Sequence, residues 1–232
     1  MTHAFVVGYD PGGTDAHGVS VLQVRAEDSE WLPLILQVNG SSTLEAALLW
    51  IEQACRGGRI VAAGIDTLTE WSSGPGGWRG ADLWLRQTYP SVAKSVVAPN
   101  SIYGSMAING AAFLTLLGPR FRSDATMVTE VHPKVCFFAL TGRKHTWIND
   151  DPQMWDWLLA ELGLESPEFV GGKDHHFDAG MAVLAALRGL NGDWKLDLHS
   201  ASEADSNSRV RFFGETHYWW PHEEVSSSRG VT

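Results

Sequence analysis

The first part of the chain alternates apolar and polar residues in a way that predicts three β-strands. Ala4–Tyr9 is a short apolar run that ends at Asp10, and Gly18–Arg25 alternates apolar and polar side chains as a half-buried strand does. Trp31–Val38 follows after the polar turn Ala26–Glu30. Three consecutive strands joined by short turns predict an antiparallel meander.

The pattern then changes to helical spacing, interrupted by short β-type runs. The residues from Ser42 to Glu45 fit a capping box that opens a helix through Ala54, and two glycines then end it. Ile60–Ile65 is an apolar run bounded by glycine and Asp66, which is typical of a buried parallel strand. Further strands are predicted at Ser95–Ala98 and Thr126–Val131, and further helices at Ala81–Thr88, Ser105–Leu117, Pro152–Leu162 and Asp174–Leu190.

This order predicts one α/β domain with a mixed five-stranded sheet, an antiparallel meander followed by parallel strands, that is flanked by helices. The domain is expected to span residues 1–195. Residues 196–232 are expected to form a polar and aromatic C-terminal extension that is partly flexible. In such sheets ligands collect at the carboxyl ends of strands, so the residues that follow the strands are the first candidates for function.

Charge and cysteine content narrow the choice of function. The 232 residues carry a net charge of −10, and Lys and Arg form no cluster. Proteins that grip long nucleic acid normally present a basic face. Either the substrate is short, or basic residues gather only in the folded state, or the protein does not act on nucleic acid. Two cysteines in apolar surroundings, no signal peptide and no membrane-length apolar stretch predict a cytoplasmic protein without membrane contact.

Three acidic residues lie at or near the ends of predicted strands. Asp10 follows the first strand, Asp66 follows the fourth, and Glu130 lies near the end of the fifth. Each aspartate alone could simply cap a turn. If the strands are neighbours, however, the carboxylates converge, and converging carboxylates repel one another unless a divalent cation neutralises them. Hard oxygen ligands favour Mg²⁺ or Mn²⁺ over zinc.

The start of the last predicted helix supplies further candidates. His175 and Asp178 are three residues apart and share one helical side with Asp174. Asp174 also suits an N-cap, and Asp178 also suits the positive end of the helix dipole. A cationic histidine is disfavoured at a helix start. We therefore favour a neutral His175 that binds metal or moves protons.

Taken in order, these motifs resemble those of domain of unknown function 429, a family of predicted RNase-H-like nucleases. The resemblance covers roughly residues 5–190, and its most specific part is Glu-Val-His-Pro. It rests on Gly8-Tyr-Asp10-Pro-Gly-Gly13, Gly64-Ile-Asp66, Arg79-Gly-Ala-Asp82 with Arg86, Glu130-Val-His-Pro133 and Asp174-His-His-Phe-Asp178-Ala.

The last helix also resembles that of RuvC-type Holliday-junction resolvases, in which a His or Asp precedes the final Asp by three residues. His175 and Asp178 match that spacing, and Asp10 matches the first-strand Asp of the superfamily. Glu130 has no counterpart in the resolvase pattern. The helix of the family usually starts with two adjacent acids, whereas here His175 takes the second place, so metal affinity or metal number could differ.

The resemblance implies an RNase-H-like fold and metal-dependent cleavage of phosphodiester bonds in DNA or RNA. Two Mg²⁺ or Mn²⁺ ions bridged by Asp10 would be held by Asp66, Asp178 and Asp174. His175 would be a ligand or a general acid–base, and Glu130 a ligand or a group that orients water.

Three further residues are candidates for contact with the substrate. Arg79 and Arg86 could clamp a phosphate through paired N–H donors, although a solvated helix face is the preferred interpretation of Arg86. His132 is a further candidate that could instead fix the turn before Pro133. The sequence leaves open whether the protein forms a homodimer.

Two other functions also stay open. Gly8-Tyr-Asp10-Pro-Gly-Gly-Thr14 resembles the first phosphate loop of actin-like and sugar-kinase-like phosphotransferases. Those enzymes need two core-sized lobes, and the sequence offers no second Gly-rich phosphate loop. The other is a catalytically inactive RNase-H-like binding or regulatory module. The acidic charge favours it, and the intact set of acids disfavours it because unused clustered carboxylates destabilise a fold.

Overall fold

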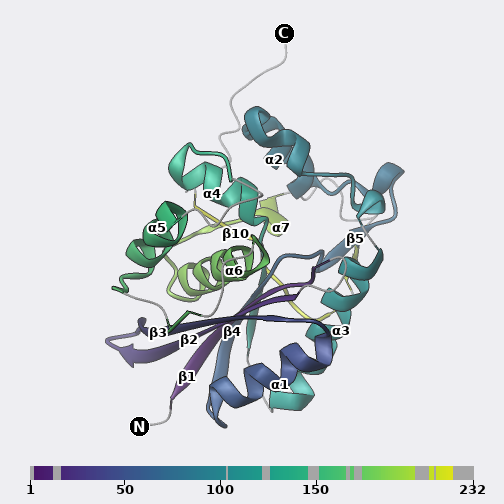
Figure 1. The fold of residues 1–232 in the computed structure, drawn as a ribbon. Coiled ribbons are helices and arrows are strands. Elements are labelled where there is room, and N and C mark those ends of the chain that lie inside the picture. The colour runs from purple at the N-terminus through teal and green to yellow at the C-terminus, as the bar shows by residue number, and fades with distance from the viewer. Residues whose placement is uncertain are drawn as a thin grey trace.

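The computed structural model of the protein describes residues 3–12, 17–102, 104–121, 126–145, 152–165, 168–169, 174–201, 209–211 and 213–221. Its centre is a twisted sheet with the strand order β6-β4-β1-β2-β3-β7 (Figure 1). The first three strands pair antiparallel, β4 and β6 extend the sheet parallel to β1, and β7 adds two residues parallel to β3. The strands are β1 (Ala4–Asp10), β2 (His17–Glu27), β3 (Glu30–Ser41), β4 (Arg59–Ile65), β6 (Met127–Glu130) and β7 (Glu168–Phe169).

The predicted RNase-H-like sheet, a meander followed by parallel strands, is therefore confirmed, with the short β7 as an addition. Helices cover both faces of the sheet (Figure 1). One face carries α1 (Leu44–Cys55) and α3 (Gly104–Phe121). The other carries α2 (Gly80–Thr88), α4 (Pro133–Thr141), α5 (Pro152–Leu162) and α6 (Asp174–Leu190). Short 3₁₀ helices η1 (Pro75–Gly77), η2 (Pro90–Ser95) and η3 (Pro99–Ser101) connect β5 (Glu70–Ser72), α2 and α3.

Strand alternation aims the two strand-end aspartates at the same face. In β1, Val6 packs in the core beside α6, whereas Val7 and Tyr9 pack in the core beside α1 and α3. Successive side chains of a strand point to opposite faces, so Asp10 shares the α6 face with Val6. In β4, Ala62 likewise packs on that face. Since Gly8 pairs with Gly64, Asp66 lies beside Asp10 and on the same side.

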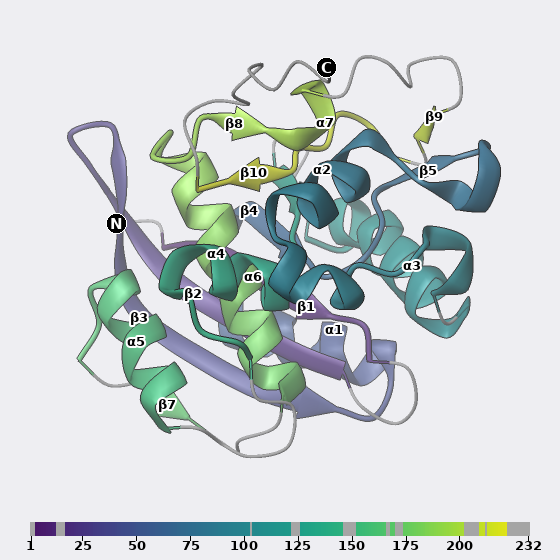
Figure 2. The same cartoon turned by 90° about the horizontal axis from the view of Figure 1, so that it is seen from above.

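Three glycines let α6 approach the sheet closely. A Cβ at Gly8 would lie 2.0 Å from the carbonyl oxygen of Ala179, and one at Gly64 would lie 1.9 Å from that of Ala182. A Cβ at Gly18 would lie 1.8 Å from the carbonyl oxygen of His175. The backbone of α6 therefore packs directly on β1, β2 and β4 (Figure 2). This contact brings the start of α6 to the carboxyl ends of β1 and β4.

We predict that Gly64→Ala destabilises the protein by about 1–3 kcal/mol, because the new methyl group must push α6 off the sheet. Gly104→Ala is the matched control, since a Cβ there meets nothing within 4 Å. The measurement is chemical denaturation of both variants. Equal free energies of unfolding for the two variants would show that α6 can move away from the sheet without cost.

Three local predictions differ from the structure. Ser95–Ala98 is not a strand, because η2 runs to Ser95 and η3 begins at Pro99. The N-cap of α1 is Thr43, whose hydroxyl accepts the N–H of Ala46, rather than Ser42. The helix α4 was missed, although Pro133 at its first position is a recognised helix start. The other predicted helices agree with α2, α3, α5 and α6 within a few residues.

The packed core continues past residue 195, the predicted domain boundary. Residues that follow it form β8 (Leu196–Asp197), α7 (Leu198–Ala201), β9 (Arg209–Arg211) and β10 (Trp219–Trp220). Tyr218 and Trp220 are buried in the same core as α6. The rest of the predicted extension, including residues 222–232, lies outside the described residues. Among the described residues, no helix combines the length and apolar character that a bilayer-spanning segment needs.

Candidate metal centre

Three aspartates from distant parts of the chain meet at the carboxyl ends of β1 and β4. Asp10, Asp66 and Asp178 each offer a carboxylate oxygen, and these oxygens all lie within 4.8 Å of one another. Asp10 and Asp178 are buried, while Asp66 is half-buried. The predicted convergence of these three side chains is confirmed. Their role as metal ligands stays a prediction.

The electrostatics of this acidic cluster would suit a bound cation. Burial raises the pKa of Asp10 to about 6, and repulsion by Asp178 adds to the effect although a hydrogen bond from His175 opposes it. Burial and the charges of Asp10 and Asp178 raise the pKa of Asp66 well above its usual value. The Oδ1 atom of Asp10 is buried without a hydrogen-bond partner. An unpaired carboxylate oxygen among other carboxylates is the environment that a hard divalent cation stabilises.

His175 belongs to this cluster through Asp10. Its Nδ1 donates to Oδ2 of Asp10 at 2.6 Å, so the two oxygens of Asp10 have different surroundings. That hydrogen bond raises the pKa of His175. Asp174 is not one of the converging side chains: its Oδ1 accepts the backbone N–H of His175 at the start of α6 and lies 3.8 Å from the Nε2 of that histidine. The predicted fourth ligand is therefore not among the converging side chains.

Two side chains that were not predicted as site residues contact Asp178. Lys134, at the second position of α4, places its Nζ 3.6 Å from Oδ2, and the Nε2 atom of His145 lies 3.0 Å from Oδ1. Burial alone would raise the pKa of Asp178, but Lys134 and His145 hold it below its usual value. Burial alone would lower the pKa of Lys134, but the surrounding aspartates raise it. Lys134 follows the Glu-Val-His-Pro motif directly, and that position was the available signal.

Glu130 and Arg79 pair with each other and not with the acidic cluster. The register of the sheet places Glu130 beside Ile65, one residue out of step with Asp66. Both of its oxygens accept N–H groups of the Arg79 guanidinium, which also binds Asp82 and the carbonyl of Glu70. Burial alone would raise the pKa of Glu130, but Arg79 lowers it strongly.

All three guanidinium nitrogens of Arg79 are used inside the protein. The prediction that Arg79 clamps a substrate phosphate stays untested, and its contacts do not support it, because each guanidinium nitrogen already donates to a carboxylate or a carbonyl inside the protein. The prediction that Glu130 binds metal or orients water is also not supported by its contacts.

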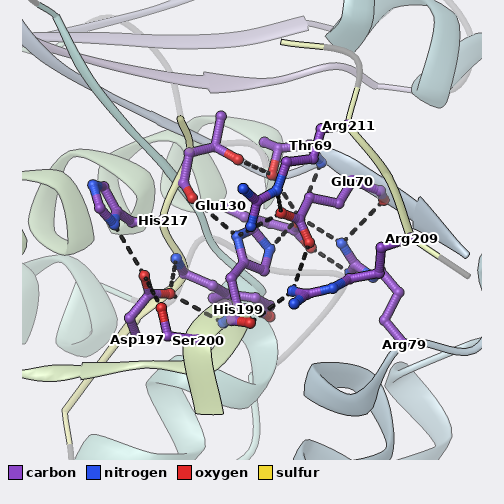
Figure 3. A network of polar contacts seen from close by, with 12 residues as sticks. Thr69, Glu70, Arg79, Glu130, Asp197, His199, Ser200, Arg209, Arg211 and His217 are labelled. Carbon is purple, nitrogen blue, oxygen red and sulfur yellow. Dashed lines mark hydrogen bonds and ion pairs between the residues drawn. The ribbon is translucent and has the colours of Figure 1, made fainter. Parts of the chain in front are cut away.

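This buried ion pair continues into the C-terminal part of the chain (Figure 3). The N–H and hydroxyl of Thr69 donate to Glu130, and Nε2 of His199 lies 3.5 Å from Glu130. The fully buried Glu70 accepts from Arg209 and Arg211 in β9. The C-terminal segment is thus fixed beside the Arg79–Glu130 ion pair through charged side chains as well as through aromatic ones.

Arg86 and His132 both bind main-chain carbonyls in η2 or directly after it. The Nη1 of Arg86 donates to the carbonyls of Ala93 and Val96, and the Nε2 of His132 lies 3.0 Å from the carbonyl of Ser95. Burial lowers the pKa of His132, which is consistent with a neutral ring that donates through Nε2. These contacts make both residues supports of the loop. For His132 this agrees with the alternative that it fixes the local chain, whereas Arg86 is half-buried and bound to carbonyls rather than part of a solvated helix face. The predicted contact of both residues with substrate stays untested.

The fold and the cluster define an α/β protein of the RNase-H-like class with a candidate site for divalent metal. Among solved structures, the chain is similar to RuvC from Thermus thermophilus, with 16% identity and a TM-score of 0.43 over 81% of this chain and 96% of that one. It is also similar to T. thermophilus RuvC in complex with a Holliday junction substrate, with 13% identity and a TM-score of 0.41 over 82% and 95%. No protein-family model matches the chain, and no curated protein does. The resemblance to domain of unknown function 429 thus rests on the quoted motifs alone.

Proposed function

We propose that the protein is a divalent-metal-dependent nuclease that hydrolyses phosphodiester bonds in nucleic acid. The observation that carries the proposal is the convergence of Asp10, Asp66 and Asp178 within 4.8 Å, from segments that are distant in sequence. The unpartnered Oδ1 of Asp10 supports it. Mg²⁺ or Mn²⁺ would suit these oxygen ligands. We further propose that the protein is cytoplasmic and belongs to the family of domain of unknown function 429.

Asp10, Asp66 and Asp178 would hold the cation, which would supply Lewis-acid polarisation of a phosphoryl oxygen. Asp10 would hold it through Oδ1, since Oδ2 accepts the proton of His175 Nδ1. That hydrogen bond orients the imidazole and leaves Nε2 to take or give a proton. We therefore assign His175 to proton transfer and not to metal binding. Lys134 balances the charge of Asp178 and would contact a phosphate that approaches the cluster.

The position of Lys134 also favours a second candidate function, that of an inactive RNase-H-like binding module. An ammonium group beside Asp178 already neutralises part of the acidic charge, so the fold tolerates the cluster more easily without metal. The phosphotransferase alternative gains no such support. Its Gly-rich turn falls partly in residues 13–16, which lie outside the described residues.

We predict that Mg²⁺ or Mn²⁺ raises the melting temperature, and that the effect depends on pH. At a metal concentration of 100 Kd the stabilisation is about 2.7 kcal/mol, or about 5–10 °C for a chain of this size. Asp10 has a folded-state pKa of about 6, above its unfolded value, so its charge costs stability as pH rises from about 4 to above 6. Protons compete with the cation for the Asp10 carboxylate as the pH falls below about 6. The apparent affinity should therefore fall about tenfold between pH 7 and pH 5.

The measurement is differential scanning fluorimetry over metal concentration at pH 5, 7 and 8, with K⁺ at equal ionic strength as the control. Incubation with single strands, RNA–DNA hybrid, duplex and branched DNA then tests hydrolysis. A melting temperature that is insensitive to both cations at every pH, with all substrates intact, would favour the inactive module.

A further inference from the structure

A cavity opens beside the acidic cluster. It has a volume of about 570 Å³, within the range of pockets that enclose small molecules. Asp66, Lys134 and His175 lie on its lining, so it shares a border with the three converging aspartates. A group bound in this pocket would lie next to any phosphate held at the cluster.

Much of the pocket wall is apolar and held in place by hydrogen bonds. Leu68 from the loop after β4, Val96 after η2, Ile102 after η3 and Met106 in the first turn of α3 contribute side chains to it. The main chain of this wall is fixed by Arg86, which donates to the carbonyl of Val96, and by His132, which binds that of Ser95. A wall supported in this way is formed before a ligand binds, which reduces the entropic cost of binding.

The charge of the pocket does not suit a long phosphate backbone. Among the described residues, four acidic and two basic side chains line it. The two basic ones, Arg79 and Lys134, both already contact carboxylates. A duplex or a long strand needs many cationic contacts, so this lining favours a ligand with few phosphates.

We propose that this pocket binds the base of a single nucleotide whose phosphate lies at the acidic cluster. A base has two flat apolar faces and a polar edge, and enzymes commonly enclose an unstacked base between apolar side chains. The pocket therefore selects a chain end, a short oligonucleotide or an unpaired nucleotide, and excludes an intact duplex. This assignment of substrate class rests on the proposed nuclease function, whereas binding of the base can be tested by itself.

Binding is tested by calorimetry in Mg²⁺ buffer with adenosine 5′-monophosphate and thymidine 5′-monophosphate, against ribose 5-phosphate. We expect the nucleotides to bind at least about tenfold more tightly, since their base buries apolar surface that ribose 5-phosphate lacks. Val97→Trp should fill the pocket and remove this difference. Val210→Trp should preserve it, because Val210 is equally exposed, 46% against 47%, and is not among the pocket-lining residues.

A second arm measures hydrolysis of a single-stranded oligonucleotide and of blunt duplex DNA by the same variants. We expect cleavage of the single strand only, and its loss in Val97→Trp. If the Val97 variant fails to fold, Ser101→Trp takes its place, because this exposed residue also lines the pocket. Equal binding of ribose 5-phosphate, or wild-type cleavage by a folded Val97→Trp protein, overturns the pocket assignment and leaves the nuclease function standing. Base-dependent binding without cleavage of any substrate supports the base pocket and removes the nuclease function.

Discussion

Replacing Arg79 with methionine is expected to lower the free energy of unfolding by about 3–5 kcal/mol, the range for removal of one partner from a buried ion pair. Methionine keeps much of the side-chain volume but removes every guanidinium donor to Glu130 and Asp82. Both carboxylates are buried, so each would have to remain charged without its partner or take up a proton. Urea denaturation at pH 7 measures the loss.

The matched control is Arg25→Met, which breaks an ion pair of the same type with Glu27 on the surface. Both side chains of that pair are about half exposed, and such pairs contribute about 0–1 kcal/mol. Adding Glu130→Gln to the Arg79 variant should recover part of the loss, since it removes the unpaired charge. A loss below 1 kcal/mol for Arg79→Met would contradict the structural role of this ion pair and return Arg79 to the candidates for substrate contact.

The positions of Asp10, Asp66 and Asp178 could be predicted because each depends on a local rule. An aspartate directly after a buried strand lies at the carboxyl edge of the sheet. The face of the sheet to which its side chain points follows from the alternation of side chains along that strand. The position of Asp178 follows from the helical spacing of the residues around it, and the same spacing predicts the helix α6. The glycines in β1 and β4 were visible in the sequence as well, although their use as contact points for α6 was not predicted.

Glu130, Arg79 and Lys134 could not be placed because their positions depend on register and on long-range packing. A shift of one residue in the pairing of β6 with β4 would have put Glu130 beside Asp66. The sequence contains no signal for that register. Lys134 reaches Asp178 only because α4 begins directly after the strand, and Glu130 meets His199 only because the C-terminal segment folds back.

The burial of the C-terminal aromatic residues also depends on long-range packing. Tyr218 and Trp220 look like part of a polar tail when only their neighbours in sequence are considered, but they fill the core beside α6 and α2. Their burial, together with the ion pairs of Glu70, places this segment next to the pocket. The site is therefore built from both ends of the chain, which local patterns cannot reveal.

Asp10→Asn is expected to reduce metal-dependent hydrolysis by at least about 100-fold and to abolish the metal-dependent rise in melting temperature. Loss of groups that only support a metal ligand already costs about 10–100-fold. The same change should stabilise the metal-free protein at pH 8 by about 1–3 kcal/mol. The charge of Asp10, whose pKa is raised from 3.8 to about 6 in the folded state, is costly above pH 6, and asparagine removes it while keeping the shape.

This opposite response of stability and activity separates a metal ligand from a turn residue. A turn-capping aspartate would lose stability on conversion to a weaker acceptor and would leave the metal response unchanged. Asp193→Asn serves as the control, because its carboxylate pairs with Arg188 at the surface and is not part of the acidic cluster, so both readouts should stay near those of the wild type. Destabilisation of the metal-free Asp10→Asn protein, with an intact response to Mg²⁺ and Mn²⁺, would mean that the three aspartates meet for structural reasons and that the proposed nuclease activity is wrong.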